Sequence, residues 1–379
     1  MTHRANINHN VLKWARIDAG YDDSNLPLAI KKNYRKWESG ELKPSWNQLR
    51  DLANQYKRPS AFFFRTEPPV KEEVDLIEYR QTEHISKKSP RLIYSIRNYK
   101  NLRDIYLELL ERKHLKKKSF KQYKFDSTSP EEFASKIRDI IGVDLKEQKR
   151  WLFDEKGSKD LKHYRFLNKW KESLNNLGIL VFESERVSSD EMKGLTLYYD
   201  EYPIIILNGS DYVNSRIFSL FHELTHLMLG ESAICDLEEE NNKEIFCNAV
   251  AGEFLVPSYD LLKKKEFKNH DPLLNYDDIL ELSNEYGVSR EVILRRILNI
   301  GKIDKESYNN KVKKLNIEYK DSGSGGNFLN NKVKYYGKMY SRLVLSTYES
   351  GIISATEFSE FMGLKINHIP KLEDMIFGD

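Results

Sequence analysis

The chain has 379 residues, with 61 Lys and Arg against 58 Asp and Glu, and only two cysteines. The nearly neutral total excludes a histone-like or polybasic nucleic-acid wrapper, and a content of 40% apolar residues excludes wholesale disorder. Two cysteines cannot form a disulfide framework, the N-terminus lacks the apolar run of a signal peptide, and the longest apolar run, at 204–207, is too short for a membrane span. We therefore expect a soluble, cytoplasmic protein with no membrane partner.

The N-terminal segment, residues 7–64, is predicted to form short helices around one core. Apolar residues recur there at helical spacing, the sequence WESG at 37–40 precedes Pro44, and Ser45 with Gln48 predicts a capping box. The pair Pro68-Pro69 breaks any helix, so we place a boundary there.

A helical connector is predicted next. Amphipathic spacing indicates a long helix over 89–113, a Pro followed by two Glu indicates a second helix over 129–142, and a third is expected over 160–176. The Lys-rich run at 113–124 is interpreted as a solvated linker, with phosphate contact as the alternative.

The pattern then changes from helical to extended. Short β-rich runs predict three strands of a small sheet, and two apolar helices joined by the acidic sequence ESAICDLEEENN follow. The strands are expected at 179–183, 195–200 and 203–208, and the two helices at 216–229 and 243–255.

The C-terminal part is predicted to be helical. Residues 277–300 have helix-turn-helix spacing around a Gly-Val-Ser turn, a flexible DSGSGG stretch follows at 321–326, and helices are expected over 332–350 and from Ser354. The fold class is thus α+β and mostly helical. The expected domains are a bundle of short helices (1–68), a helical connector (69–170), a domain with the three-stranded sheet and the two apolar helices (171–265) and a C-terminal helical domain with a helix-turn-helix-like unit (266–379).

The sharpest local signal is the sequence HELTH at 222–226. His222 and His226 are one helical turn apart, so both imidazoles can reach a single ion, and Glu223 is placed to polarise a metal-bound water. Two surface histidines with no metal would be the alternative. A zinc site that is purely structural is a further alternative, although such sites favour Cys and four protein ligands.

A catalytic zinc site needs a third protein ligand. The metzincin pattern would place a third His six residues after His226, but position 232 holds Ser, so that pattern is excluded. Glu244, at the start of the next helix, is the preferred third ligand. Glu253 is nine residues further and therefore on the opposite face of that helix. Cys247 is interpreted as packing, because a buried thiol in an apolar helix is more often that than a ligand. Weaker candidates remain in the acidic loop: Asp236, Glu238, Glu239 and Glu240.

These residues resemble a known family. The sequences FSLFHELTHLMLG and EIFCNAVAGEFLVP are similar to the ImmA/IrrE metallopeptidases. The resemblance implies that 171–265 is a zincin-like domain and that one zinc ion per chain is held by His222, His226 and Glu244, with Glu223 as the catalytic residue, as in a gluzincin. The N-terminal segment is similar to an Xre-type helix-turn-helix, although the stretch from Gly20 to Trp37 is shorter than usual.

The Xre resemblance implies that the segment holding the recognition helix contacts DNA. The alternative is that the bundle is used only for protein contacts. The candidate DNA-binding residues are Lys31, Lys32, Asn33, Arg35 and Lys36. Arg290, Arg295 and Arg296 of the second helix-turn-helix-like unit could assist, or could form ion pairs with the acidic loop instead.

The expected function is that of a zinc-dependent, site-specific endopeptidase. An extended substrate could pair with the strand at 203–208 or with that at 195–200. The resemblance implies a transcriptional repressor as the protein substrate, in a stress or mobile-element response. The alternative is a DNA-binding regulator or antitoxin in which the zinc domain is a sensor or scaffold.

Overall fold

The computed structural model describes residues 3–69, 89–120, 129–153, 159–185, 187–189, 191–230, 237–264, 267, 275–318 and 328–377. The chain divides into two units, Met1–Asn101 and Leu102–Asp379. The long helix α5 begins in the first unit and ends in the second.

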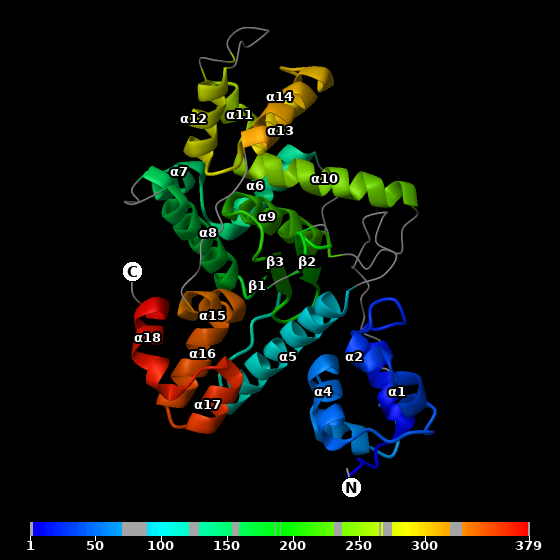
Figure 1. Cartoon of the computed structure of the whole chain (residues 1–379). Helices are drawn as coiled ribbons and strands as arrows, with labels where there is room; N and C mark the ends of the chain where they lie inside the picture. The colour runs from blue at the N-terminus through cyan, green and yellow to red at the C-terminus, as the bar shows by residue number, and fades with distance from the viewer. Residues whose placement is uncertain are drawn as a thin grey trace. The chain divides into compact units, whose positions relative to one another are not determined.

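The first unit is a bundle of short helices around its own apolar core (Figure 1, blue). Leu12, Leu49 and Tyr56 are almost fully buried in that core. The predicted capping box is present, because Ser45 and Gln48 each bond the backbone N–H of the other. The elements are α1 (His9–Asp18), α2 (Leu28–Lys31), α3 (Tyr34–Glu38), α4 (Trp46–Tyr56), the 3₁₀ helix η1 (Ser60–Phe64) and the start of α5 (Pro90–Arg112).

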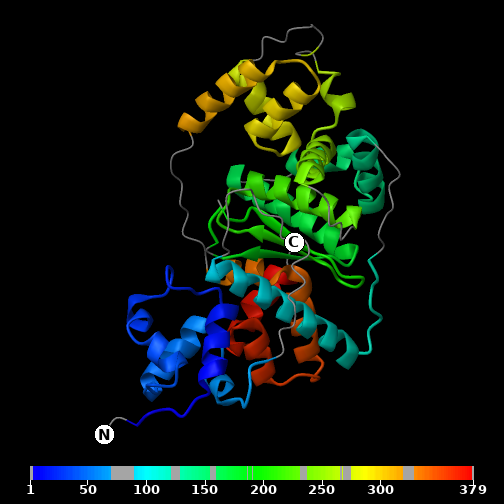
Figure 2. The same ribbon diagram turned by 90° about the vertical axis from the view of Figure 1, so that its right-hand side faces the viewer.

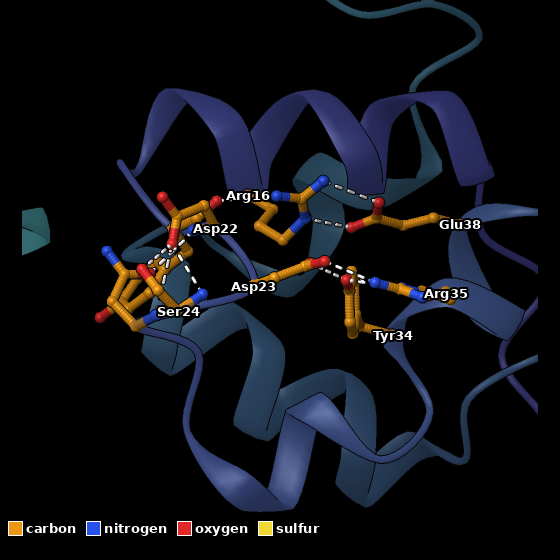
Figure 3. Close-up of polar contacts among 9 residues, drawn as sticks. Arg16, Asp22, Asp23, Ser24, Tyr34, Arg35 and Glu38 are labelled. Carbon is orange, nitrogen blue, oxygen red and sulfur yellow. Dashed lines mark hydrogen bonds and ion pairs between the residues drawn. The ribbon is translucent and has the colours of Figure 1, made fainter. Parts of the chain in front are cut away.

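Polar contacts hold α3 against the preceding loop and α1 (Figure 3). The guanidinium of Arg16 donates from Nε to Glu38 at 2.7 Å, and Asp23 accepts from both Tyr34 and Arg35. These bonds fix the short helix α3, which has only five residues.

The second unit contains the sheet and the remaining helices. Its helices are α6 (Pro130–Ile141), α7 (Leu145–Phe153), α8 (Lys159–Asn176), α9 (Val213–Leu229), α10 (Leu237–Leu255), α11 (Ser258–Leu261), α12 (Tyr276–Tyr286), α13 (Arg290–Asn299), α14 (Lys305–Glu318), α15 (Phe328–Tyr336), α16 (Lys338–Glu349), α17 (Ala355–Met362) and α18 (Ile369–Phe377), with the 3₁₀ helix η3 (Ile366–His368).

The predicted three-stranded sheet is confirmed. Its strands are β1 (Leu180–Ser184), β2 (Gly194–Leu197) and β3 (Ile204–Asn208), in the order β1-β3-β2. β3 pairs with β1 in parallel and with β2 in antiparallel orientation. β3 is therefore the central strand, so the expectation that 203–208 could pair with a substrate is wrong, because both of its edges are already hydrogen-bonded.

Helices cover both faces of the sheet, which explains why β1 and β3 are buried along their whole length. α8 and α9 lie on one side, and the C-terminal helices lie on the other (Figure 2). The main apolar cluster joins α9 and α10 to this layer through Trp170, Phe221 and Phe254, and the rings of Phe221 and Phe254 stack with centroids 4.1 Å apart. The core thus fixes the helices α9 and α10 that carry the candidate metal ligands.

Several element boundaries differ from those expected. The predicted helix over 332–350 is two helices, because Gly337 takes φ +71° between them. α10 starts at Leu237, so Glu238, Glu239 and Glu240 belong to a helix and not to a loop. α7 and α14 were not expected. The stretch at 321–326, the end of the Lys-rich run (121–124) and Asp236 lie outside the described residues.

Among the helices of these ranges, none is both long enough and apolar enough to cross a membrane.

Candidate metal centre

The two histidines of HELTH lie on α9, on adjacent turns. Their Nε2 atoms are 3.1 Å apart, and the rings meet edge to face. α9 is held in place by its apolar residues, since Leu220, Leu224 and Leu227 are fully buried in the main core. His222 and His226 are only partly buried and can be reached from solvent.

Glu244 reaches the same point from α10. Its two carboxylate oxygens lie 3.1 Å from Nε2 of His222 and 3.2 Å from Nε2 of His226. Ligand atoms of all three residues lie within 4.8 Å of one another, and no other such group of three His, Cys, Asp or Glu was found in the part of the chain that the structure describes. Glu244 thus lies on the face of α10 that is turned toward the two histidines.

The remaining nitrogen of each imidazole is occupied from α10. Nδ1 of His222 lies 3.0 Å from Oδ1 of Asn248, and Nδ1 of His226 lies 3.6 Å from Sγ of Cys247. Oδ1 of Asn248 can only accept, so it holds the proton on Nδ1 of His222 and leaves Nε2 of that ring free to bind a metal. Cys247 is fully buried and faces Nδ1 of His226, so its sulfur is not among the converging ligand atoms.

The charges of this group support one another. Burial works against the charged form of His222, but its hydrogen bond to Glu244 and the nearby carboxylates outweigh burial and raise the pKa of His222. Burial would also raise the pKa of Glu244, but the hydrogen bonds from both histidines outweigh it and hold that pKa below its usual range. Glu244 therefore stays ionised at neutral pH, as a metal ligand must be.

Glu223 follows His222 on α9 and turns toward the sheet. Its side chain is almost buried, and Thr196 of β2 lies within hydrogen-bond distance of it. Sequence reasoning named Glu223 and missed Thr196.

Sequence reasoning also missed an ion network beneath α9. Arg216 of α9 and Lys171 of α8 both pair with Glu183 of β1, and all three side chains are buried. Tyr164 accepts a further hydrogen bond from Arg216 at 3.0 Å. A charged residue at the end of the apolar run ILVFE and an arginine in an apolar helix were the signals that could have predicted this network.

Other sequence-derived candidates lie away from this group. Glu253 pairs with Arg296 and accepts from the backbone N–H of Ser258 at 2.8 Å, which agrees with its expected position on the opposite face of α10. Arg290 and Arg296 are buried, so the suggestion that they help to hold DNA is wrong for these two. Arg295 is exposed and lies over the ring of Tyr308.

The candidate DNA-binding residues lie in the first unit, from the end of α2 to α3. Arg35 pairs with Asp23 at 2.5 Å, and Lys36 lies 3.6 Å from Glu41. The four cations of this set, Lys31, Lys32, Arg35 and Lys36, are exposed, and Asn33 is partly buried.

Residues 174–298 match the model of the IrrE N-terminal-like domain, Peptidase M78. The matched span contains the whole sheet, both histidines and Glu244. One solved structure, a Mycobacterium tuberculosis transcriptional regulator, is 15% identical over 45% of this chain, with a TM-score of 0.25. The similar region spans about half, 52%, of that regulator's chain. No curated protein is significantly similar to this chain.

Proposed function

We propose that this protein is a zinc-dependent endopeptidase that cuts a partner protein at a specific site. The observation that supports the proposal most is the convergence of His222, His226 and Glu244 within the span that matches Peptidase M78. Two imidazoles and one carboxylate are a donor set that catalytic zinc sites use, and they leave a fourth position open. The contact of Asn248 Oδ1 with Nδ1 of His222 fits the same metal, because it turns Nε2 of that ring toward the other two ligand residues.

When bound, zinc would act as a Lewis acid on the scissile carbonyl and lower the pKa of water. The protein's own residues would do the rest. His222, His226 and Glu244 would hold the ion, and Glu223 would accept the proton of the attacking water and then donate it to the amide nitrogen of the leaving amine. Glu223 is suited to this because it adjoins a ligand histidine and lies on the side of α9 that faces the sheet.

β2 is the strand that could bind the substrate. It is an edge strand, with β3 as its strand partner, and it packs against α9. An extended peptide could add to such an edge through main-chain hydrogen bonds. The substrate would therefore need a looped or locally unfolded segment. We propose that the substrate is a repressor-type DNA-binding protein of the cytoplasm and that its cleavage belongs to a stress or mobile-element response.

The test compares zinc-loaded wild type with Glu223→Gln in a lysate of the source organism. New protein N-termini are then identified by mass spectrometry. We expect a small set of cuts made by wild type and absent with Glu223→Gln. The same set of cuts with both proteins would refute the mechanism.

The charge of the first unit supports a second function, that of a DNA-binding regulator or antitoxin. Residues 3–69 contain 12 Lys and Arg against 7 Asp and Glu, a net charge of +5, whereas the whole chain has +3. Exposed cations on α2 and α3 could contact phosphates, as expected for an Xre-type unit, although the five residues of α3 offer little surface for reading bases.

Fluorescence anisotropy with a labelled 30-base-pair duplex tests this second function. Affinity should fall steeply with salt, and Lys31→Ala with Lys32→Ala should lower the salt slope by about two if each contacts one phosphate. An affinity that is weak and insensitive to salt would contradict DNA binding and would favour a role of this unit in protein contacts only.

A further inference from the structure

Two residues of β2 lie directly against the side chain of Glu223. Oγ1 of Thr196 is 2.9 Å from Oε2 of Glu223 and 3.0 Å from its backbone oxygen. Thr196 is 3% exposed and Glu223 8% exposed, so water competes little for these bonds. The hydroxyl thus contacts both the carboxylate and the main chain of the same residue.

Gly194 is two residues before Thr196, on the same face of the strand. A Cβ atom at Gly194 would lie 2.6 Å from Oε1 and 2.7 Å from Cγ of Glu223. The space that a side chain would fill at position 194 is therefore taken by the Glu223 side chain. Glycine is not needed there for its backbone angles, because Gly194 is not among the residues with positive φ.

The strand that carries both residues is itself fixed. Gly194 pairs with Leu207 and Thr196 pairs with Ile205 in the antiparallel ladder with β3. A slip of one residue would turn both away from α9. Because β3 is the central strand, the position of Glu223 is tied to the sheet as well as to its own helix.

We propose that Thr196 is a positioning residue for Glu223 and that Gly194 provides the room in which the carboxylate lies; this rests on the proposed function, in which Glu223 moves the proton. A hydroxyl has one proton and two lone pairs. It can donate to the ionised carboxylate, and it can donate to the Glu223 backbone oxygen while accepting from the protonated acid. Thr196 can thus hold Glu223 in one place before and after proton transfer.

Three variants separate this role from simple packing. Thr196→Val keeps the shape and removes the hydroxyl, Thr196→Ser keeps the hydroxyl, and Gly194→Ala displaces the carboxylate without removing any polar group. Gly194→Ala is expected to fold, because the atoms that it would displace belong to the Glu223 side chain and not to the backbone. The matched control is Thr347→Val, which removes a buried hydroxyl that donates to the carbonyl of Leu343 in α16.

The first measurement does not depend on activity. Zinc content and crystal structures are determined for wild type and all four variants. We expect one zinc per chain throughout, with the Glu223 carboxylate displaced in Thr196→Val and Gly194→Ala and in its wild-type place in Thr196→Ser and Thr347→Val. An unmoved Glu223 in Thr196→Val, or loss of zinc in that variant, would overturn the positioning role.

The second measurement uses a peptide that spans a bond cut by wild type. We expect kcat to fall about 10- to 100-fold in Thr196→Val with KM unchanged, and to be restored in Thr196→Ser. An unchanged kcat would also overturn the positioning role. If no bond is cut by wild type, the proposed function fails, and the crystal structures still decide whether Thr196 and Gly194 hold Glu223.

Discussion

Oε2 of Glu244 lies 3.1 Å from Nε2 of His222, although the two residues belong to different helices and are 22 positions apart. Replacing Glu244 by Ala should therefore weaken zinc binding by at least about 100-fold, because it removes one of three protein ligands. Free zinc at 1,000 times its Kd should stabilise wild type by about 4 kcal/mol and the variant far less. Thermal unfolding with and without zinc measures this, and equal stabilisation of both proteins would exclude Glu244 as a ligand.

Asn248 should tune the metal site without touching the metal. Its Oδ1 lies 3.0 Å from Nδ1 of His222, so Asn248→Ala should lower zinc affinity by about 10- to 100-fold. Ile245→Ala is the matched control, since Ile245 is on the same helix, next to Glu244, and is exposed. Competition with a fluorescent zinc chelator gives both affinities. A similar loss in the two variants would show that α10 is generally perturbed and that Asn248 has no specific role.

The candidate metal group could be predicted because the positions of its side chains depend largely on local helix geometry. The spacing of His222 and His226 puts both on one face of any α-helix, and the offset of nine positions puts Glu244 and Glu253 on opposite faces of theirs. Thr196 could not be found in this way. It meets Glu223 across 27 residues, through a contact between a strand and a helix, and that contact depends on strand register and packing that no local periodicity specifies.

The missed elements of the fold have similar causes. α7 has apolar residues only at its two ends, and its inner face includes the buried Gln148, which donates to the carbonyls of Leu255 and Tyr286. A polar residue on the inner face hides the apolar stripe that predicts a helix. The break at Gly337 was missed because apolar residues continue at helical spacing on both sides of it.

The buried ion network should make the fold sensitive to acid. Burial alone would raise the pKa of Glu183, but Lys171 and Arg216 outweigh burial and hold that pKa at about 2, below the 4.5 of an ordinary glutamate. Ionised Glu183 therefore stabilises the folded state above pH 4.5, and this stabilisation is lost as the pH falls toward 2. Between pH 6 and pH 3 wild type should lose about 2 kcal/mol more stability than Glu183→Gln. Urea unfolding at both pH values measures the difference, and parallel losses would mean that Glu183 titrates normally.

Gly337 should be more sensitive to substitution than Gly351, a glycine of similar backbone conformation. A Cβ atom there would lie 2.6 Å from the backbone oxygen of Val181, which is held in β1 and cannot move aside. Gly351 has a similar φ, +69° against +71°, but nothing within 4 Å of its Cβ position. Both alanine variants have the same left-handed strain, about 1–2 kcal/mol, so the difference between them reports the clash. Gly337→Ala should cost about 1–3 kcal/mol more than Gly351→Ala in urea unfolding. Equal costs would show that the junction of α15 and α16 does not press against β1, whereas the expected difference would show that this junction packs directly on the strand that carries Glu183.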